Sequence, residues 1–140
     1  MTALANDRDT ASYVPQEVFS YKTKGATTYY AGGLVNSDAS GFLVKATDTA
    51  SHKCVGRAEE AKTSIAGDGN DLLRVGNGIF EFATSGGSAI VQADVGRLCY
   101  VLDDQTVVKT GGTSNAVVAG KVVAILSATS VLVDTRIKSV

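Results

Sequence analysis

The chain of 140 residues has no tryptophan, one histidine, one methionine, one proline and two cysteines. Nucleophilic catalysis of the Ser-His-Asp or Cys-His kind needs a histidine base, and the single candidate, His52, lies in a polar loop. His52 and two distant cysteines at unrelated spacing do not make a metal site. We therefore expect a protein that is not an enzyme and that holds no metal or cofactor.

Long apolar runs and clustered basic residues are also missing. No run approaches the roughly 18 apolar residues that a membrane span needs, and the first residues lack the basic start and apolar core of a signal peptide. The formal net charge is −1, and lysine and arginine are scattered rather than gathered into a stripe that would neutralise phosphates. We expect synthesis in a cytoplasm, with neither a membrane nor a nucleic acid as partner.

Other candidate sites have simpler interpretations. Cys54 and Cys99 sit in apolar segments, which favours two buried thiols in a reducing cytosol, with a disulfide as the alternative. The pairs Glu59-Glu60 and Asp103-Asp104 are interpreted as solvated turns, because adjacent strand residues face opposite ways. The loop 67–71 carries three oxygen-bearing side chains but lacks the spacing of a calcium loop, so an ordinary loop is preferred over a calcium site.

Short apolar runs separated by Gly, Ser, Thr, Asn and Asp turns dominate the second half of the chain. The runs cover residues 72–75, 79–82, 98–102, 106–108, 117–126 and 131–133. Their spacing predicts an all-β fold, a small β-barrel or β-sandwich, with at most one short helix, placed within residues 57–65. Phe80 and Phe82 should share one strand face and Ile79 and Glu81 the other. Asn77-Gly78 suggests a hairpin between 72–75 and 79–84.

The first 30 residues differ from the rest, because they hold four of the five tyrosines and few aliphatic residues. We predict an extended N-terminal arm and first strand over residues 1–30, followed by one β domain over 31–140. The candidate contact residues with another subunit or shell are Tyr13, Val14, Pro15, Phe19 and Tyr21. The alternative is that Phe19, Tyr21 and Tyr29 simply begin the sheet of their own subunit.

A loose internal repeat is also visible. Residues 41–45 followed by 55–58 are similar to residues 96–101 followed by 119–124, and in each half the later segment contains a glycine beside a basic residue. The gaps between the segments differ.

The order of these segments resembles the capsid cement, or head decoration, proteins of tailed bacteriophages. The resemblance covers residues 32–137 and is carried by 79–82, 92–100, Asp103-Asp104, 120–124 and 131–136. These match the family's Gly-hydrophobic-Phe-Glu strand, its Gln-x-Asp turn before a Tyr-containing strand, its Asp-rich hairpin, its Val-Gly strand and its closing strand. The chain departs from the pattern at Ala119-Gly120-Lys121 and in its longer, tyrosine-rich N-terminus.

The resemblance implies a compact β subunit, often a homo-trimer, that binds the major capsid protein on the outer surface of an expanded head. Its location would be the virion, and its function the stabilisation of the head against the pressure of packaged DNA. Deleting residues 1–21 is then expected to abolish shell binding and to leave a folded domain. The alternative function is a β-sandwich module of a phage fibre that binds carbohydrate or a host surface.

Overall fold

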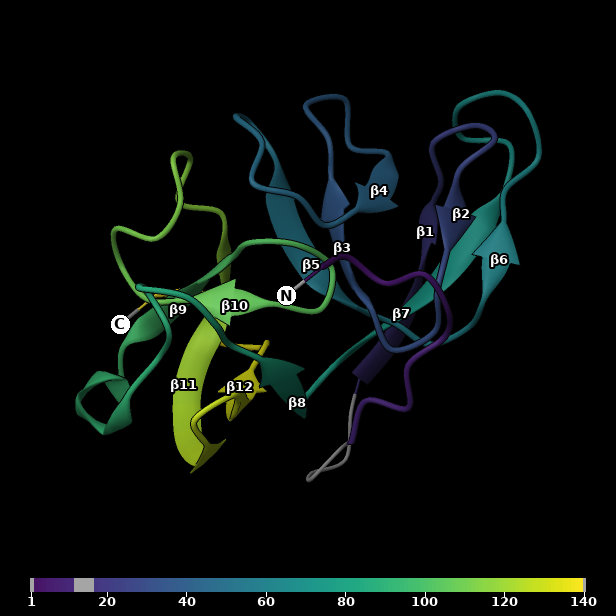
Figure 1. Ribbon diagram of the computed structural model, residues 1–140. Helices are drawn as coiled ribbons and strands as arrows, with labels where there is room; N and C mark the ends of the chain where they lie inside the picture. Colours follow the sequence, from purple (N-terminus) through teal and green to yellow (C-terminus); the bar gives the residue numbers. More distant parts are fainter. Residues whose placement is uncertain (1, 12–16, 140) are drawn as a thin grey trace.

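The computed structural model describes residues 2–11 and 17–139 and is an all-β structure, as the sequence predicts (Figure 1). The strands are β1 (Glu17–Lys22), β2 (Thr28–Tyr29), β3 (Leu34–Ser37), β4 (Leu43–Lys45), β5 (Lys53–Ala58), β6 (Lys62–Thr63), β7 (Leu72–Asn77), β8 (Ile79–Ala83), β9 (Leu98–Val101), β10 (Val107–Val108), β11 (Val118–Ser127) and β12 (Ser130–Asp134). One 3-10 turn, η1 (Gln92–Asp94), is the only helical segment in the described ranges. The limit of one short helix is therefore confirmed, but its expected place within 57–65 is wrong, because this stretch forms the end of β5, a bend and β6.

The strands form two five-stranded sheets, and each sheet closes on itself. The first has the order β1-β7-β5-β3-β4, and a parallel bridge between Thr23 and Leu43 joins its two ends. The second has the order β10-β9-β11-β12-β8 and is closed in the same way between Ala83 and Thr106. We call these barrel 1 and barrel 2. The short β2–β6 ladder belongs to neither sheet.

The two barrels repeat one topology. Counted along the chain, the strands of each barrel follow the order first, fifth, fourth, second and third around the sheet. The register repeats as well: Leu34 opposite Arg57 in barrel 1 corresponds to Leu98 opposite Lys121 in barrel 2. A bulge follows at the same place in both pairs. The chain is therefore an internal structural duplication whose halves meet at Gly78.

The internal repeat found in the sequence is partly confirmed by this duplication. Residues 55–58 and 119–124 lie in β5 and β11, which occupy equivalent places. Residues 41–45 and 96–101 are not equivalent, because the counterpart of β9 is β3 rather than β4. The sequence similarity thus compares β9 with β4, one strand away from its counterpart β3, because β4 and β9 are both short and both precede a polar turn.

The main core fills barrel 2 and continues onto the outer side of barrel 1. Phe80 and Phe82 are fully buried in it, with ring centroids 6.3 Å apart in an edge-on arrangement, whereas Ile79 and Glu81 are only partly buried. The predicted division of faces along this strand is confirmed. From barrel 1 the core takes Leu34, Ala46 and Cys54, so the two barrels share one apolar interior.

A smaller core fills barrel 1. It consists of Tyr29, Val35, Leu43, Ala58, Leu73 and Val75. The β2–β6 ladder supplies Tyr29, whose hydroxyl donates a hydrogen bond of 2.5 Å to the backbone oxygen of Leu43. A phenol buried this deeply needs such a partner, because an unpaired buried hydroxyl is costly.

The predicted hairpin between residues 72–75 and 79–84 is wrong. β7 pairs with β1 and β5 in barrel 1, whereas β8 pairs with β12 in barrel 2. The chain crosses between the barrels at Gly78, whose N–H donates to the Thr135 hydroxyl (3.1 Å) and whose carbonyl accepts from the Thr135 N–H (2.9 Å). Asn77-Gly78 is thus a connection between barrels, not a reversal.

Arg57 joins the two barrels and the N-terminal segment. Its guanidinium lies 4.1 Å from the ring centroid of Phe80 and contacts both carboxylate oxygens of Glu59, at 2.7 and 3.0 Å. It also donates to the backbone oxygen of Thr10. Because Arg57 and Glu59 are both largely buried, each depends on the other for charge compensation.

Candidate functional site

The predicted contact residues fall into three groups. Tyr13, Val14 and Pro15 lie outside the described residues. Phe19 and Tyr21 lie on β1, which pairs with β7, so the alternative interpretation, that they begin the sheet of their own subunit, is correct for both. Tyr29 lies on the separate β2–β6 ladder and is buried in the core of barrel 1.

Phe19 is the most exposed aromatic side chain on this strand, with 57% of its surface accessible. Phe19 pairs with Val75 of β7, and Val75 also pairs with Ala58 of β5. In barrel 2 the equivalent position on β8 is Phe80, which pairs with Val133 of β12. Phe80 is completely buried. Equivalent phenylalanines therefore have opposite environments, and the one on β1 is left open.

A hollow of about 300 Å³ adjoins β1 and separates it from the end of barrel 2. Its lining residues are Glu17, Phe19, Tyr21, Val55, Asn77, Thr135, Arg136 and Lys138. We call it the β1 hollow. It places both described contact candidates beside the C-terminal residues of barrel 2.

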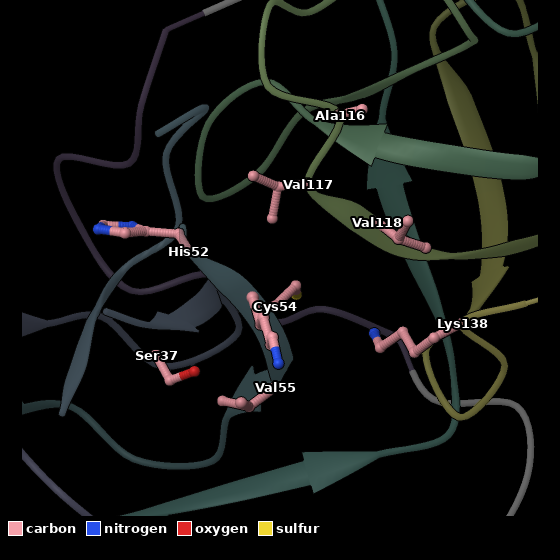
Figure 2. A pocket seen from close by; sticks show the side chains of 9 residues that line it. Ser37, His52, Cys54, Val55, Ala116, Val117, Val118 and Lys138 are labelled. Atoms are coloured by element: carbon pink, nitrogen blue, oxygen red, sulfur yellow. The ribbon is translucent and has the colours of Figure 1, made fainter. Parts of the chain in front are cut away.

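A second hollow, of about 390 Å³, lies between the barrels and is shown in Figure 2. We call it the inter-barrel pocket. One wall comes from the start of β5 (His52, Lys53, Cys54 and Val55) and the other from the start of β11 (Ala116, Val117 and Val118), with Ser37 and Lys138 completing it. These two walls are equivalent segments of the duplication. The pocket shares Val55 and Lys138 with the β1 hollow.

Hydrogen bonds from both barrels hold the pocket walls in place. The Asp48 carboxylate accepts from the backbone N–H groups of Ser114 (2.8 Å) and Asn115 (2.9 Å), which fixes the loop before Ala116. The Lys138 ammonium donates to the backbone oxygen of Ala119 at 2.5 Å. Figure 2 shows the Lys138 side chain extending toward Cys54, whereas the His52 ring extends away from it.

The two cysteines are free and buried, which confirms the interpretation as two thiols rather than a disulfide. Cys54 lies in the wall of the inter-barrel pocket, and Cys99 is in the main core. Burial raises the pKa of Cys99 to about 12, so this thiol stays protonated at neutral pH.

The interpretation of Asp103-Asp104 as a solvated turn is wrong for Asp104. This side chain is buried, and it accepts a hydrogen bond of 2.8 Å from the backbone N–H of Leu4. Burial raises the pKa of its carboxyl group. The sequence did not reveal this, because the covering residue lies at the other end of the chain.

The remaining acidic candidates have structural partners. The interpretation as a solvated turn is also wrong for Glu59, whose carboxylate is largely buried against Arg57, whereas Glu60 is partly exposed and paired with Arg74 at 3.3 Å. In loop 67–71, Asp68 contacts Lys24 at 3.3 Å, and Asp71 contacts Lys62 at 2.9 Å. These contacts agree with the interpretation as an ordinary loop.

Across residues 2–11 and 17–139, no three His, Cys, Asp or Glu side chains gather as metal ligands would. In the same residues, no helix has the length and apolar character needed to cross a membrane.

Sequence reasoning missed the inter-barrel pocket altogether. Its walls and Lys138 are brought together only by the packing of one barrel on the other. The one available signal was the similarity of residues 55–58 to 119–124, which indicated equivalent strands.

No protein-family model, curated protein or solved structure significantly matches this chain.

Proposed function

We propose that this chain is a bacteriophage capsid decoration (cement) protein, which binds the outer surface of the expanded head through β1 and stabilises it. The sequence resemblance supplies the class of protein. The observation that carries the contact assignment is β1, a six-residue strand that pairs only with β7 among the described residues and exposes Val18 and Phe19.

An exposed strand of this kind is suited to contact with another protein. Val18 is 42% and Phe19 57% exposed. The sheet is closed beside β1 by the single Thr23–Leu43 bridge, so among the described residues the outer edge of Glu17–Lys22 has no strand partner. Natural proteins usually blunt such an edge with charges or cover it, because it otherwise pairs with other chains. An aromatic side chain beside a hollow is also a frequent anchor in protein interfaces.

A decoration protein stabilises a shell by mass action. Any protein that binds the expanded lattice better than the dissociated subunits shifts the equilibrium toward the lattice. The contact made by each copy need not be strong, because a homo-oligomer that spans several shell subunits gains avidity. In this proposal the major capsid protein is the partner, and no catalytic step is involved.

The test is the binding of purified protein to expanded heads that were prepared without it. Phe19→Ser should lower the apparent affinity for heads by about tenfold, since it removes an exposed apolar anchor worth roughly 1–2 kcal/mol. The matched control is Leu126→Ser, which changes a similarly exposed apolar residue on the distant part of β11. Occupancy is measured by sedimentation of heads followed by quantitative gel analysis.

Two results would count against the proposal. Equal decoration by wild type and Phe19→Ser would remove β1 from the contact. Failure of the wild-type protein to bind heads, together with binding to a glycan array, would favour the carbohydrate-binding alternative.

A further inference from the structure

We propose that the inter-barrel pocket binds a small amphipathic carboxylate, with the apolar body of the ligand against Val117 and Val118 and its carboxylate at Lys53 and Lys138. This proposal rests on the pocket alone and is independent of shell binding through β1.

The place and size of the pocket suit a small ligand. Its volume of about 390 Å³ falls within the range of small-molecule sites, which commonly lie where two structural units meet. Here the units are the two barrels, and the walls come from equivalent segments at the starts of β5 and β11. Residues on both sides are held by the Asp48 and Lys138 hydrogen bonds described above.

The two walls differ in chemistry although they are structurally equivalent. The β11 side presents Ala116, Val117 and Val118, which carry no polar side-chain atom. The equivalent β5 side presents His52, Lys53 and Cys54. A ligand that touches both walls therefore needs one apolar side and one polar side.

The charge of the lining selects an anion. Lys53 and Lys138 carry positive charge, and the nine lining residues include no Asp or Glu. The Lys138 ammonium has three protons, and the bond to the Ala119 oxygen uses one of them. In Figure 2 this side chain lies below Val118 and extends toward Cys54. A carboxylate there gains charge-assisted hydrogen bonds, whereas an ammonium ligand meets like charge.

The experiment uses the full chain labelled with 15N and two probes of equal length and opposite charge. Sodium octanoate should shift the amide signals of residues 52–55 and 116–118 in a saturable manner. Octylammonium chloride has the same apolar body, and its affinity should be at least about tenfold lower. Absence of saturable shifts with octanoate, or equal affinity for both probes, would overturn the proposal.

Two lysine variants test the placement of the carboxylate. Lys138→Met should weaken octanoate binding about tenfold, because it removes the inner ammonium. Because Lys138 also holds the Ala119 oxygen, Lys53→Met serves as a second variant: its side chain is exposed, and the expected loss is about threefold. Lys109→Met lies outside the lining and should bind octanoate as the wild type does. Unchanged affinity in Lys53→Met and in a folded Lys138→Met would overturn the assignment.

Discussion

Single residues show how an equivalent position acquires a different role in each barrel. Phe80 is enclosed by the main core and by the guanidinium of Arg57, which lies 4.1 Å from its ring. Phe19 occupies the corresponding place on β1 but opens onto the β1 hollow. The difference comes from what lies next to each ring, not from the residue itself. An aromatic residue alternating with polar neighbours predicts a strand face, but the sequence does not reveal whether that face will be covered.

Asp134 gives a prediction about pH at this same scale. Its buried carboxylate accepts hydrogen bonds from Nε (2.9 Å) and Nη2 (3.0 Å) of Arg136, and these bonds hold the pKa of Asp134 below its usual value. A carboxyl whose folded-state pKa is lowered stabilises the fold above its unfolded-state pKa, and this stability is lost as the pH falls through the folded-state pKa. Asp134→Asn should therefore lower the free energy of unfolding at pH 7 by about 1 kcal/mol.

The measurement for Asp134 is urea unfolding of wild type and Asp134→Asn across a pH series. The difference between them should shrink as the pH falls below about 4, because protonation of unfolded Asp134 then favours the unfolded wild type, and it should vanish once the pH passes the lower folded-state pKa. A difference that stays constant from pH 7 to pH 3 would show that the charge on Asp134 contributes nothing to stability.

At the scale of elements, the N-terminal segment is part of the folded body. The N–H of Arg8 donates to the Ala31 oxygen at 2.7 Å, and the Thr10 hydroxyl donates to the Gly32 oxygen at 2.6 Å; both acceptors lie in the turn that leads into β3 of barrel 1. The backbone N–H of Leu4 donates a hydrogen bond to the Asp104 carboxylate of barrel 2. Residues 2–11 thus form a strap across both barrels. Moreover, β1 is one of the five strands of barrel 1.

These contacts revise the expectation that a chain without residues 1–21 stays folded. A shorter deletion, of residues 2–11, already removes several partly buried hydrogen bonds, each worth about 1 kcal/mol. It should lower the free energy of unfolding by about 3 kcal/mol, measured by urea denaturation. Removal of residues 2 and 3 alone, which keeps the Leu4, Arg8 and Thr10 contacts, is the control and should behave nearly as wild type. An unchanged unfolding midpoint for the longer deletion would contradict the strap.

The elements also show what the sequence could predict. The alternation in β8 and the runs that became β9, β11 and β12 reflect local side-chain patterning, so the strands were predictable. The predicted hairpin at Asn77-Gly78 is wrong because a local turn preference does not determine which strand a strand pairs with. Thr135, far along the chain, hydrogen-bonds to Gly78 and holds the chain where it passes from barrel 1 to barrel 2. The helix expected near residue 60 does not form. Glu59 pairs with Arg57 and Glu60 pairs with Arg74, and both glutamates lie in a bend between strands.

At the scale of the whole molecule, duplication explains both the fold and the two hollows. Two copies of one five-stranded topology pack so that the outer side of barrel 1 completes the core of barrel 2. Their walls do not match perfectly, and the inter-barrel pocket and the β1 hollow remain between them. The exposure of Phe19 was predictable from its place in the aromatic N-terminal segment, whereas Tyr21 is partly buried against the core of barrel 1. The pocket was not predictable, because it depends on the packing of residues 52–55 against 116–118 and Lys138.

The proposed decoration of a phage shell is tested most directly by the copy number of this chain in purified, DNA-filled particles of a phage whose genome carries the sequence. Quantitative mass spectrometry compares this chain with the major capsid protein. A decoration role predicts a ratio near one to one, because a cement protein occupies the repeating lattice of the head. Absence of the chain, or only a few copies per particle, would rule out this role and favour one in a fibre or at the host surface.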